Sequence, residues 1–332
     1  MVEEDPRVRA VVTSEVALHY AEGADPGEDR PAHVRAGSGL ARAGDRLVVV
    51  QDDALFVALV DARGSGPTHA LALPREGGQR LFEARRGNKA RKPDFECLAP
   101  LGPEVMVAFG SGSTSARRRA LRLRCEPWPP RAELVACEAM YVALGATVEF
   151  AGSELNVEGA AVVGDRLRLF QRGNGAPRGE LLPVSATVDL PLDALAAYLD
   201  ACAADPSAPF DVPLLDVRRY DIGRVEGVAL GFTDACALRV GDRALAWVAA
   251  AEASPDTYDD GETVGVCLGW MRDDGSAGRG PVLTAEGEPY RAKVEGLYVD
   301  PVDPTRAWAV VDADDVDAPA RLITLTVEGF VG

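Results

Sequence analysis

The sequence has 332 residues, of which 47% are hydrophobic and 26% are charged, the balance of a globular protein able to bury a core. Lysine and arginine together number 35 against 52 aspartates and glutamates, so the net charge is -17. A field of that sign repels nucleic acid and anionic membranes, and no apolar run reaches the 18 residues that suggest a membrane span, so we expect neither as a partner.

The N-terminus and the cysteines indicate the compartment. Residues 1–7 lack the basic and apolar regions of a secretory signal. The six cysteines are scattered without zinc-type spacing, and the three histidines are too few for a histidine-based metal cluster. We therefore expect free, buried thiols in a cytoplasmic protein.

In chain order, the first predicted element is a strand within Arg7–Tyr20, and a repeated pattern follows it. The pattern is a short apolar strand, a tight turn such as Gly-Asp-Arg, and a second apolar strand. It is clearest in GSGLARAGDRLVVVQ (37–51) and VEGAAVVGDRLRLFQ (157–171), and it returns at 95–109, 225–248 and 294–311. Gly-Asp between two strands is typical of hairpins, because glycine tolerates the positive φ of tight turns.

The spacing of one marker position in this pattern predicts the fold. Successive markers are 58, 62, 68 and 69 residues apart, and they are Ser38, Glu96, Glu158, Glu226 and Glu295. Further strands are predicted at Phe56–Val60, His69–Leu73, Ala120–Arg124, Val184–Leu190 and Leu322–Val327. A repeat of this length with four short strands is typical of a propeller blade. We predict an all-β fold, with residues 1–332 forming one five-bladed β-propeller domain.

Two segments lie outside the regular repeat. Leu192–Ala204 has the apolar spacing of an amphipathic helix, interpreted as a surface helix between the third and fourth units. The last unit lacks a clear fourth strand, and closed propellers commonly complete the last blade with the N-terminal strand, which removes exposed edges. We expect Arg7–Tyr20 to close the last blade in this way.

The marker positions also predict chemistry at the centre. The innermost strand of each blade lines the central channel, so the five marker residues are expected to form one ring. Carboxylates held close together raise one another's pKa, which leaves three resolutions: a bound cation, shared protons, or pairing with inward-pointing arginines. Oxygen ligands suit Ca²⁺, with Mg²⁺ as the second choice because it demands stricter geometry and keeps more water. The alternative is a plug of carboxylates and water that holds no metal.

The five-unit layout with Ser-Glu-Glu-Glu-Glu at the marker resembles the soluble calcium-activated nucleotidase (apyrase) family. The segments that carry the resemblance are 37–53, 89–110, 245–265 and 305–327. The resemblance implies a five-bladed propeller with an axial Ca²⁺ held by serines and glutamates, and hydrolysis of nucleoside di- and triphosphates. Carried over residue by residue, it makes the calcium ligands Ser38, Glu96, Glu158, Glu226 and Glu295.

The sequence departs from that family where a polyphosphate would bind. The family follows an Asp-Asp pair with arginine, whereas here Ala54 follows Asp52 and Asp53. The family's paired arginines correspond here to Ala251 and Glu252. Phosphoryl transfer depends on such cations. We therefore expect the scaffold and the metal to carry over, and the nucleotidase activity not to.

The mouth of the channel is predicted to carry the remaining candidates. Arg172 is the candidate electrophile, and Asp52 or Glu252 is the candidate general base; the alternative for each is ordinary loop polarity. Two functions compete. One is a monomeric Ca²⁺-binding propeller whose face binds a small molecule or a protein, and the other is a metal-dependent hydrolase of phosphoesters, phosphoanhydrides or other esters. The missing arginines favour the first.

Overall fold

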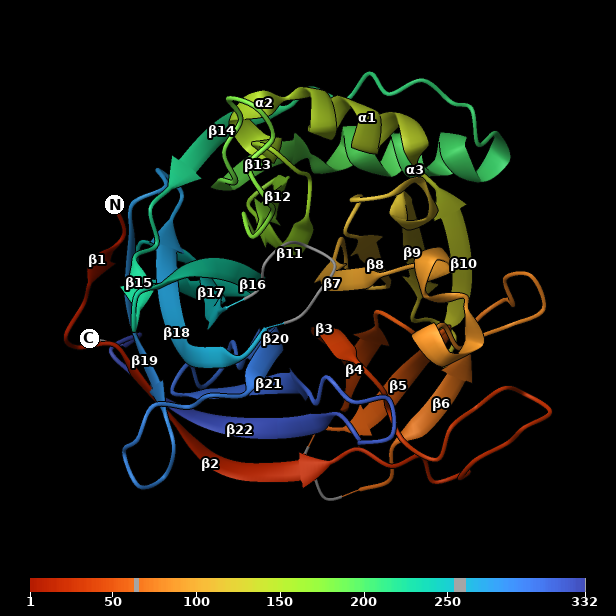
Figure 1. Cartoon of the computed structure of the whole chain (residues 1–332), viewed down its shortest axis with the longest axis horizontal. Helices are drawn as coiled ribbons and strands as arrows, with labels where there is room; N and C mark the ends of the chain where they lie inside the picture. The colour runs from red at the N-terminus through yellow and green to blue at the C-terminus, as the bar shows by residue number, and fades with distance from the viewer. Residues whose placement is uncertain (63–65, 254–260, 332) are drawn as a thin grey trace.

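The computed structural model describes residues 1–62, 66–253 and 261–331. Strands predominate in it, and the sheets stand around a central axis in a propeller-like arrangement (Figure 1). Within these ranges the strands form three four-stranded sheets and one ten-stranded sheet. The prediction of a mainly β protein is confirmed.

The three smaller sheets are antiparallel, and in each of them consecutive strands pair with one another. The first consists of β3 (Gly37–Ala43), β4 (Arg46–Gln51), β5 (Phe56–Asp61) and β6 (His69–Ala72). The second consists of β7 (Phe95–Pro100), β8 (Val105–Gly110), β9 (Arg119–Arg124) and β10 (Arg131–Ala136). The third consists of β11 (Val157–Val163), β12 (Arg166–Gln171), β13 (Ser185–Pro191) and β14 (Leu215–Tyr220).

The ten-stranded sheet has two antiparallel parts. One contains β15 (Arg224–Val225), β16 (Val228–Val240), β17 (Arg243–Glu252), β18 (Thr263–Arg272) and β19 (Ala277–Leu283). The other contains β20 (Lys293–Val299), β21 (Arg306–Asp312), β22 (Arg321–Glu328) and β2 (Arg9–Ala17). The parts meet where β19 pairs with β2 in parallel over two residue pairs, and the short β1 (Glu3–Glu4) also lies parallel to β19.

The N-terminal strand joins the last strand of the chain. β2 is antiparallel to β22, with Arg9 opposite Glu328 and Ala17 opposite Arg321 (Figure 1). The expected pairing of the segment Arg7–Tyr20 with the final strand is therefore confirmed. The pairing covers an edge that β22 would otherwise expose.

Among the described strands, five surround the axis. They are β3, β7, β11, β16 and β20; each contacts the next in this order, and β20 contacts β3, so the ring is closed. The Gly-Asp pairs form the predicted turns, since Ala43 pairs with Arg46 across a two-residue loop. Gly44 has a φ of +58° there, a conformation that glycine adopts without strain.

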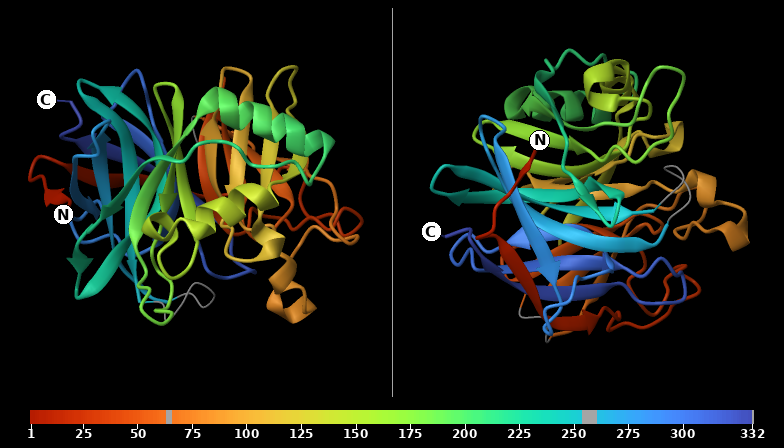
Figure 2. Two further views of the ribbon diagram at one scale, coloured as in Figure 1. Left: turned by 90° about the horizontal axis from the view of Figure 1, so that it is seen from above. Right: turned by 60° about the vertical axis from the view of Figure 1, so that its left-hand side comes forward.

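The helices lie outside this ring (Figures 1 and 2). The predicted helix is present as α3 (Leu192–Ala204), whereas α1 (Glu138–Ala146) and α2 (Val148–Ala151) are not predicted from the sequence. Tyr141 and Phe150 pack in the same core as Leu199 of α3. No helix of the described ranges is long and apolar enough to cross a membrane. Short 3-10 turns occupy Ala84–Arg86, Lys89–Arg91 and Ser115–Arg117.

Candidate functional site

An irregularity in pairing marks each of the five strands around the axis. In β7, for example, the register against β8 shifts between Phe95 and Cys97, so Glu96 falls outside the regular ladder. A bulge of this kind re-aims a side chain. One such shift in each strand holds a buried residue with a polar side chain, and these are Ser38, Glu96, Glu158, Thr233 and Glu295; β16 has a second shift, between Ala237 and Val240. Four of these five are the residues that the marker spacing singles out.

Close approach of the inner strands explains the glycine that follows the marker in three of these strands. A Cβ on Gly39 would lie 2.6 Å from the carbonyl carbon of Cys97, and a Cβ on Gly296 would lie 2.5 Å from the carbonyl oxygen of Ser38. Neither distance leaves room for a side chain. In β11 and β20 the recurring Glu-Gly pair therefore combines a re-aimed carboxylate with a residue that lets two strands come together.

The structure corrects the expectation for Glu226. This residue lies in the turn between β15 and β16 with a φ of +51°, and its exposed carboxylate forms an ion pair with Arg291. Thr233 takes the fifth bulge position instead, and its hydroxyl donates a hydrogen bond to the carbonyl oxygen of Val294 at 2.7 Å. The sequence Val-Glu-Gly at 225–227 is identical to that at 157–159. The part of β16 that faces the axis, however, begins on the C-terminal side of it.

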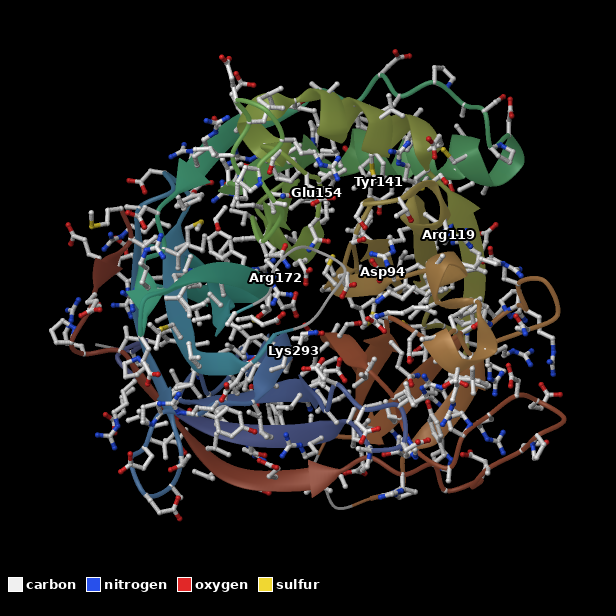
Figure 3. All side chains as sticks on the ribbon, in the orientation of Figure 1. Asp94, Arg119, Tyr141, Glu154, Arg172 and Lys293 are labelled. Carbon is white, nitrogen blue, oxygen red and sulfur yellow. The ribbon has the colours of Figure 1, made fainter. Side chains whose placement is uncertain are left out.

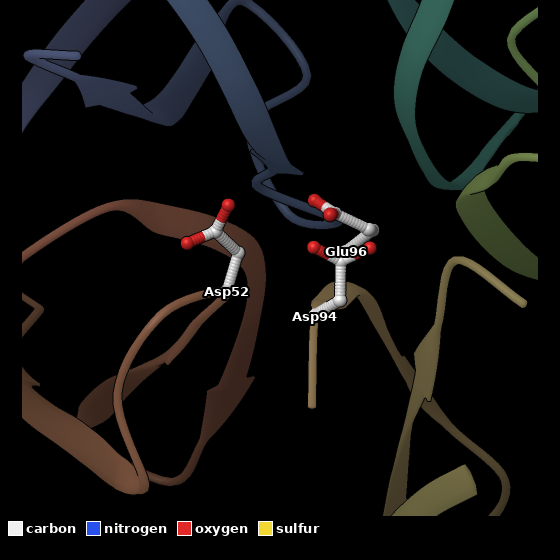
Figure 4. A group of neighbouring side chains, drawn as sticks. All are labelled: Asp52, Asp94 and Glu96. Atoms are coloured by element: carbon white, nitrogen blue, oxygen red, sulfur yellow. The ribbon is translucent and has the colours of Figure 1, made fainter. Parts of the chain in front are cut away.

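Asp52, Asp94 and Glu96 form a carboxylate cluster beside the axis (Figure 4). One oxygen from each lies within 4.8 Å of the others. Asp52 follows β4 and Asp94 precedes β7, and the Asp94 amide donates to the Asp52 carbonyl oxygen at 3.0 Å. Asp94 has a φ of +57°, so a bend in the backbone holds its carboxylate beside that of Glu96.

Two cations contact this cluster. The Lys92 Nζ lies 2.6 Å from Asp52 Oδ2 and 2.6 Å from Asp94 Oδ1, and the Arg117 Nη1 lies 2.9 Å from Asp94 Oδ2. Burial alone would raise the pKa of Asp94, but the charges of Lys92 and Arg117 outweigh it and lower that pKa. The side chain of Lys92 is only 12% exposed, so this lysine belongs to the site.

Glu96 is the member of the cluster that no cation of the described residues contacts. It is 7% exposed, and the described part of the chain offers its carboxylate no direct hydrogen bond or ion pair. Burial raises its pKa well above the usual range, and the neighbouring charges of Asp94 and Glu158 raise it further. A carboxylate in this position gains from either a proton or a bound cation.

The other side of the axis carries a second, better compensated group of charges (Figure 3). Arg172 Nη2 lies 2.7 Å from Glu252 Oε2, while its Nη1 lies 3.5 Å from Glu158 Oε1 and 3.7 Å from Glu295 Oε1. Lys293 Nζ lies 3.2 Å from Glu295 Oε1. Glu158 and Glu295 are thus paired with inward-pointing cations. Pairing with inward-pointing arginines is one of the three ways of relieving carboxylate repulsion that the sequence leaves open.

The predicted catalytic candidates divide between these two groups. Arg172 and Glu252 are brought together as an ion pair, and Asp52 belongs to the carboxylate cluster across the axis. Among the described residues, the ion pairs and the carboxylate cluster on the two sides of the axis join eight carboxylates and four cations. The carboxylates are those of Asp52, Asp94, Glu96, Glu158, Glu252, Glu295, Asp312 and Asp314, and the cations are Lys92, Arg117, Arg172 and Lys293. The formal excess of four negative charges favours a cation over an anion in this region.

A small cavity of about 160 Å³ adjoins the carboxylate cluster. Its polar lining consists of Asp52, Asp53, Glu83, Lys89, Lys92, Asp312, Asp314 and Asp315. Burial and the charge of Asp52 raise the pKa of Asp53 to about 7, although its partner Arg35 counteracts them. Burial also raises the pKa of Asp312 to about 8. The cavity therefore opens on side chains whose protonation changes near neutral pH.

Asp234 is a further axial carboxyl group that the sequence did not indicate. It follows Thr233, is fully buried, and its Oδ2 accepts a hydrogen bond from the Leu297 amide at 2.8 Å. Burial raises its pKa well above the usual range, while the backbone amides around it counteract the increase. It links β16 to β20, and we interpret it as a structural group.

Comparison with known proteins places the chain in a family. A model of the "Family of unknown function (DUF6929)" matches residues 33–327. The chain belongs to this family. No curated protein matches the sequence.

Solved structures that are similar to this DUF6929 member share little sequence with it. The Myxococcus xanthus glutaminyl cyclase has 10% identity and a TM-score of 0.49, with 97% of this chain and 98% of that chain covered. The Neurospora crassa Pan2 WD40 domain has 8% identity and a TM-score of 0.40, with 98% and 97% covered. A streptogramin B lyase has 8% identity and a TM-score of 0.39, with 95% and 98% covered. Likeness at this level carries no argument about ligands or activity.

Proposed function

We propose that this chain is a five-bladed β-propeller that binds a divalent cation, Ca²⁺ first and Mg²⁺ second, at Asp52, Asp94 and Glu96. The blade count is supported by the closed contacts of β3, β7, β11, β16 and β20. On this interpretation the ten-stranded sheet is two blades, which meet only at the short parallel contact of β19 with β2. The carboxylate cluster then lies at one mouth of the channel.

The observation that carries the cation site is the uncompensated carboxylate of Glu96. It is buried beside two further carboxylates, and Oδ1 of Asp52 is also buried without a hydrogen-bond partner among the described residues. Lys92 and Arg117 balance two of the three negative charges, which leaves one charge and open oxygen atoms. Ca²⁺ takes 6–8 oxygen ligands in flexible geometry, so three carboxylates with water would suit it.

This ligand set differs from the one expected from the sequence, and the counter-ions are the reason. Glu158 and Glu295 lie near the axis, but Arg172 and Lys293 already compensate their charge. The Ser38 hydroxyl donates to the carbonyl oxygen of Phe95. These groups would support the site from the second shell of the cation or through water. The bound cation would supply positive charge at the mouth, where a small molecule or a protein segment could bind in the adjoining cavity.

Calorimetric titration tests the site with a matched pair of variants. Glu96→Gln removes one ligand charge with little change in shape, and Glu226→Gln makes the same chemical change on an exposed turn. We expect CaCl₂ to bind the native chain and Glu226→Gln equally, and Glu96→Gln at least about tenfold more weakly, the loss of roughly one charged ligand interaction. Equal binding by both variants, or no binding to the native chain, would contradict the proposal.

A calcium-dependent hydrolase related to the nucleotidases is the second candidate, and one observation favours it. The pKa of Glu96 is raised while that of neighbouring Asp94 is lowered, and two carboxylates separated in this way are typical of acid–base sites. Asp52 or Glu252 would assist as a base, with Arg172 as the electrophile. Assays with nucleoside triphosphates and simple esters, in Ca²⁺ and in chelator, distinguish the two functions. Turnover that needs Ca²⁺ and is lost in Glu96→Gln supports the hydrolase.

A further inference from the structure

A cavity of about 420 Å³ lies at the outer edge of the molecule, where the N-terminal segment meets β18 and β19. We propose that this cavity binds an organic monocarboxylate, with the carboxylate on Arg279 and an apolar body against the surrounding valine and proline side chains. Its apolar lining comes from Pro6, Val8, Val225, Val266, Pro281 and Val282. The proposal does not depend on the cation site at the axis.

The Arg279 guanidinium carries the proposal, because its hydrogen-bond donors have few partners among the described residues. The residue is 9% exposed, and its Nε has no hydrogen-bond partner among the described residues. Within the described ranges its Nη1 donates to the sulfur of Cys267 alone, at 3.5 Å, and thiols are weak acceptors. Its Nη2 lies 2.9 Å from the Glu4 carboxylate. Several donors of a buried cation are thus left with weak partners or none.

Arg168 shows how this protein otherwise compensates a buried arginine. Both Arg168 and its partner Asp189 are fully buried, and the guanidinium donates to the two carboxylate oxygens at 2.6 and 2.8 Å. The partner of Arg279 is different, because the side chain of Glu4 is 78% exposed and stands on the two-residue strand β1. The ion pair is exposed on the Glu4 side alone, so a ligand can displace the Glu4 carboxylate and pair with the buried charge of Arg279.

The other charged residues at the cavity do not change its expected preference for a negatively charged ligand. Asp5 lines the cavity, but Arg7 holds its carboxylate at 2.9 and 3.0 Å and the Trp270 indole donates to it at 3.2 Å. Arg9 adds a second positive side chain to the lining. A guanidinium presents a planar fork that matches a carboxylate, and the apolar walls suit the rest of a fatty or branched-chain acid. The Glu4 carboxylate occupies part of the position that a bound carboxylate would take, so it acts as an internal competitor.

Octanoate is a suitable probe, with octylamine and 1-octanol as molecules of similar size and different charge. We expect calorimetry on the full chain to show binding of octanoate and at least about tenfold weaker binding of the other two, because they lack the charged acceptor. Glu4→Gln removes the competitor and should strengthen octanoate binding several-fold. Glu3→Gln is the matched control, since it makes the same charge change at the adjacent exposed position of β1.

Arg279→Gln completes the test by removing the charge that the proposal requires. It should weaken octanoate binding at least about tenfold, to the level of 1-octanol. Octanoate that binds no better than 1-octanol, or equally well to Arg279→Gln, overturns the proposal. If Arg279→Gln does not fold, the Glu4 and Glu3 variants decide, since equal octanoate affinity in both also overturns it.

Discussion

Replacing Arg172 by glutamine should be among the most damaging single changes in the chain. The guanidinium is 5% exposed and lies within 3.7 Å of carboxylate oxygens on Glu158, Glu252 and Glu295. Removing one partner of a buried ion pair costs about 3–5 kcal/mol, because the remaining charge stays buried without compensation. Lys293 would still contact Glu295, so the cost falls on Glu158 and Glu252. We expect the free energy of unfolding at pH 8.5 to fall by about 3–5 kcal/mol.

The cost should depend on pH with a definite sign. Burial already raises the pKa values of Glu158 and Glu295 in the folded chain, and the charge of Arg172 counteracts that increase. Without Arg172 these pKa values rise further. A carboxyl group whose pKa is raised on folding contributes stability below its unfolded pKa, and that contribution is lost as the pH rises through the folded value. Arg172→Gln should therefore be less harmful at pH 6 than at pH 8.5.

Urea unfolding followed by tryptophan fluorescence measures both effects. Arg291→Gln is the matched control, because the side chain of Arg291 is 46% exposed and forms an ion pair with Glu226, whose side chain is 55% exposed. That substitution should cost no more than about 1 kcal/mol at either pH. The reasoning fails if Arg172→Gln costs as little as the control, or if its cost is the same at pH 6 and pH 8.5.

Two further substitutions test the axial carboxyl groups. Burial raises the pKa of Asp312 to about 8, so stability should be lost as the pH rises from about 4 to 8. Asp312→Asn should remove that loss, so in urea titrations it should stabilise the chain more at pH 8.5 than at pH 6. An equal effect at both pH values would contradict the raised pKa of Asp312. Asp234→Ala removes the acceptor of the Leu297 amide and leaves a void, and calorimetry should show a loss of about 2–4 kcal/mol. Asp234→Asn should recover most of this lost stability. A loss below about 0.5 kcal/mol in the alanine variant would show that Asp234 does not link β16 to β20.

The repeat in the sequence predicted the arrangement of strands because each unit repeats the same pattern of strand, tight turn and strand. A tight turn between two apolar strands recurs along the chain, and a glycine follows the marker in three of the five inner strands, where two strands approach closely. The helices α1 and α2 escaped prediction because their sequence, with Gly145 and several β-branched residues, lacks a clear helical stripe. Tertiary packing of Tyr141 and Phe150 holds them instead.

The site could be predicted only in part. The marker spacing identifies Ser38, Glu96, Glu158 and Glu295 because they occupy equivalent bulges. It fails at Glu226 because a Val-Glu-Gly before β16 imitates the repeat. Counting back from the turn glycine comes closer without reaching the residue: six residues before Gly241, the spacing between Glu158 and Gly164, is Ala235, two residues from Thr233.

Long-range contacts explain why other members of the site were missed. Lys92 and Asp94 reach the axis because the backbone bends at Asp94 and its amide pairs with the Asp52 carbonyl oxygen. Arg117 approaches from a 3-10 turn in the following loop. No local pattern encodes these contacts, because they depend on how two neighbouring sheets pack. Residues 254–260, which belong to the segment 245–265 that carries the family resemblance, lie outside the described residues.

A crystal grown in millimolar Ca²⁺, with anomalous diffraction from crystals in which Mn²⁺ or Tb³⁺ replaces it, tests the cation site most directly. The account predicts a peak among Asp52, Asp94 and Glu96, with Ca²⁺ at about 2.3–2.6 Å from their oxygens. It also predicts that the peak disappears in Glu96→Gln and persists in Glu226→Gln. An axis without a metal peak, with Lys92 still contacting both aspartates and Glu96 hydrogen-bonded only to water, would contradict the account.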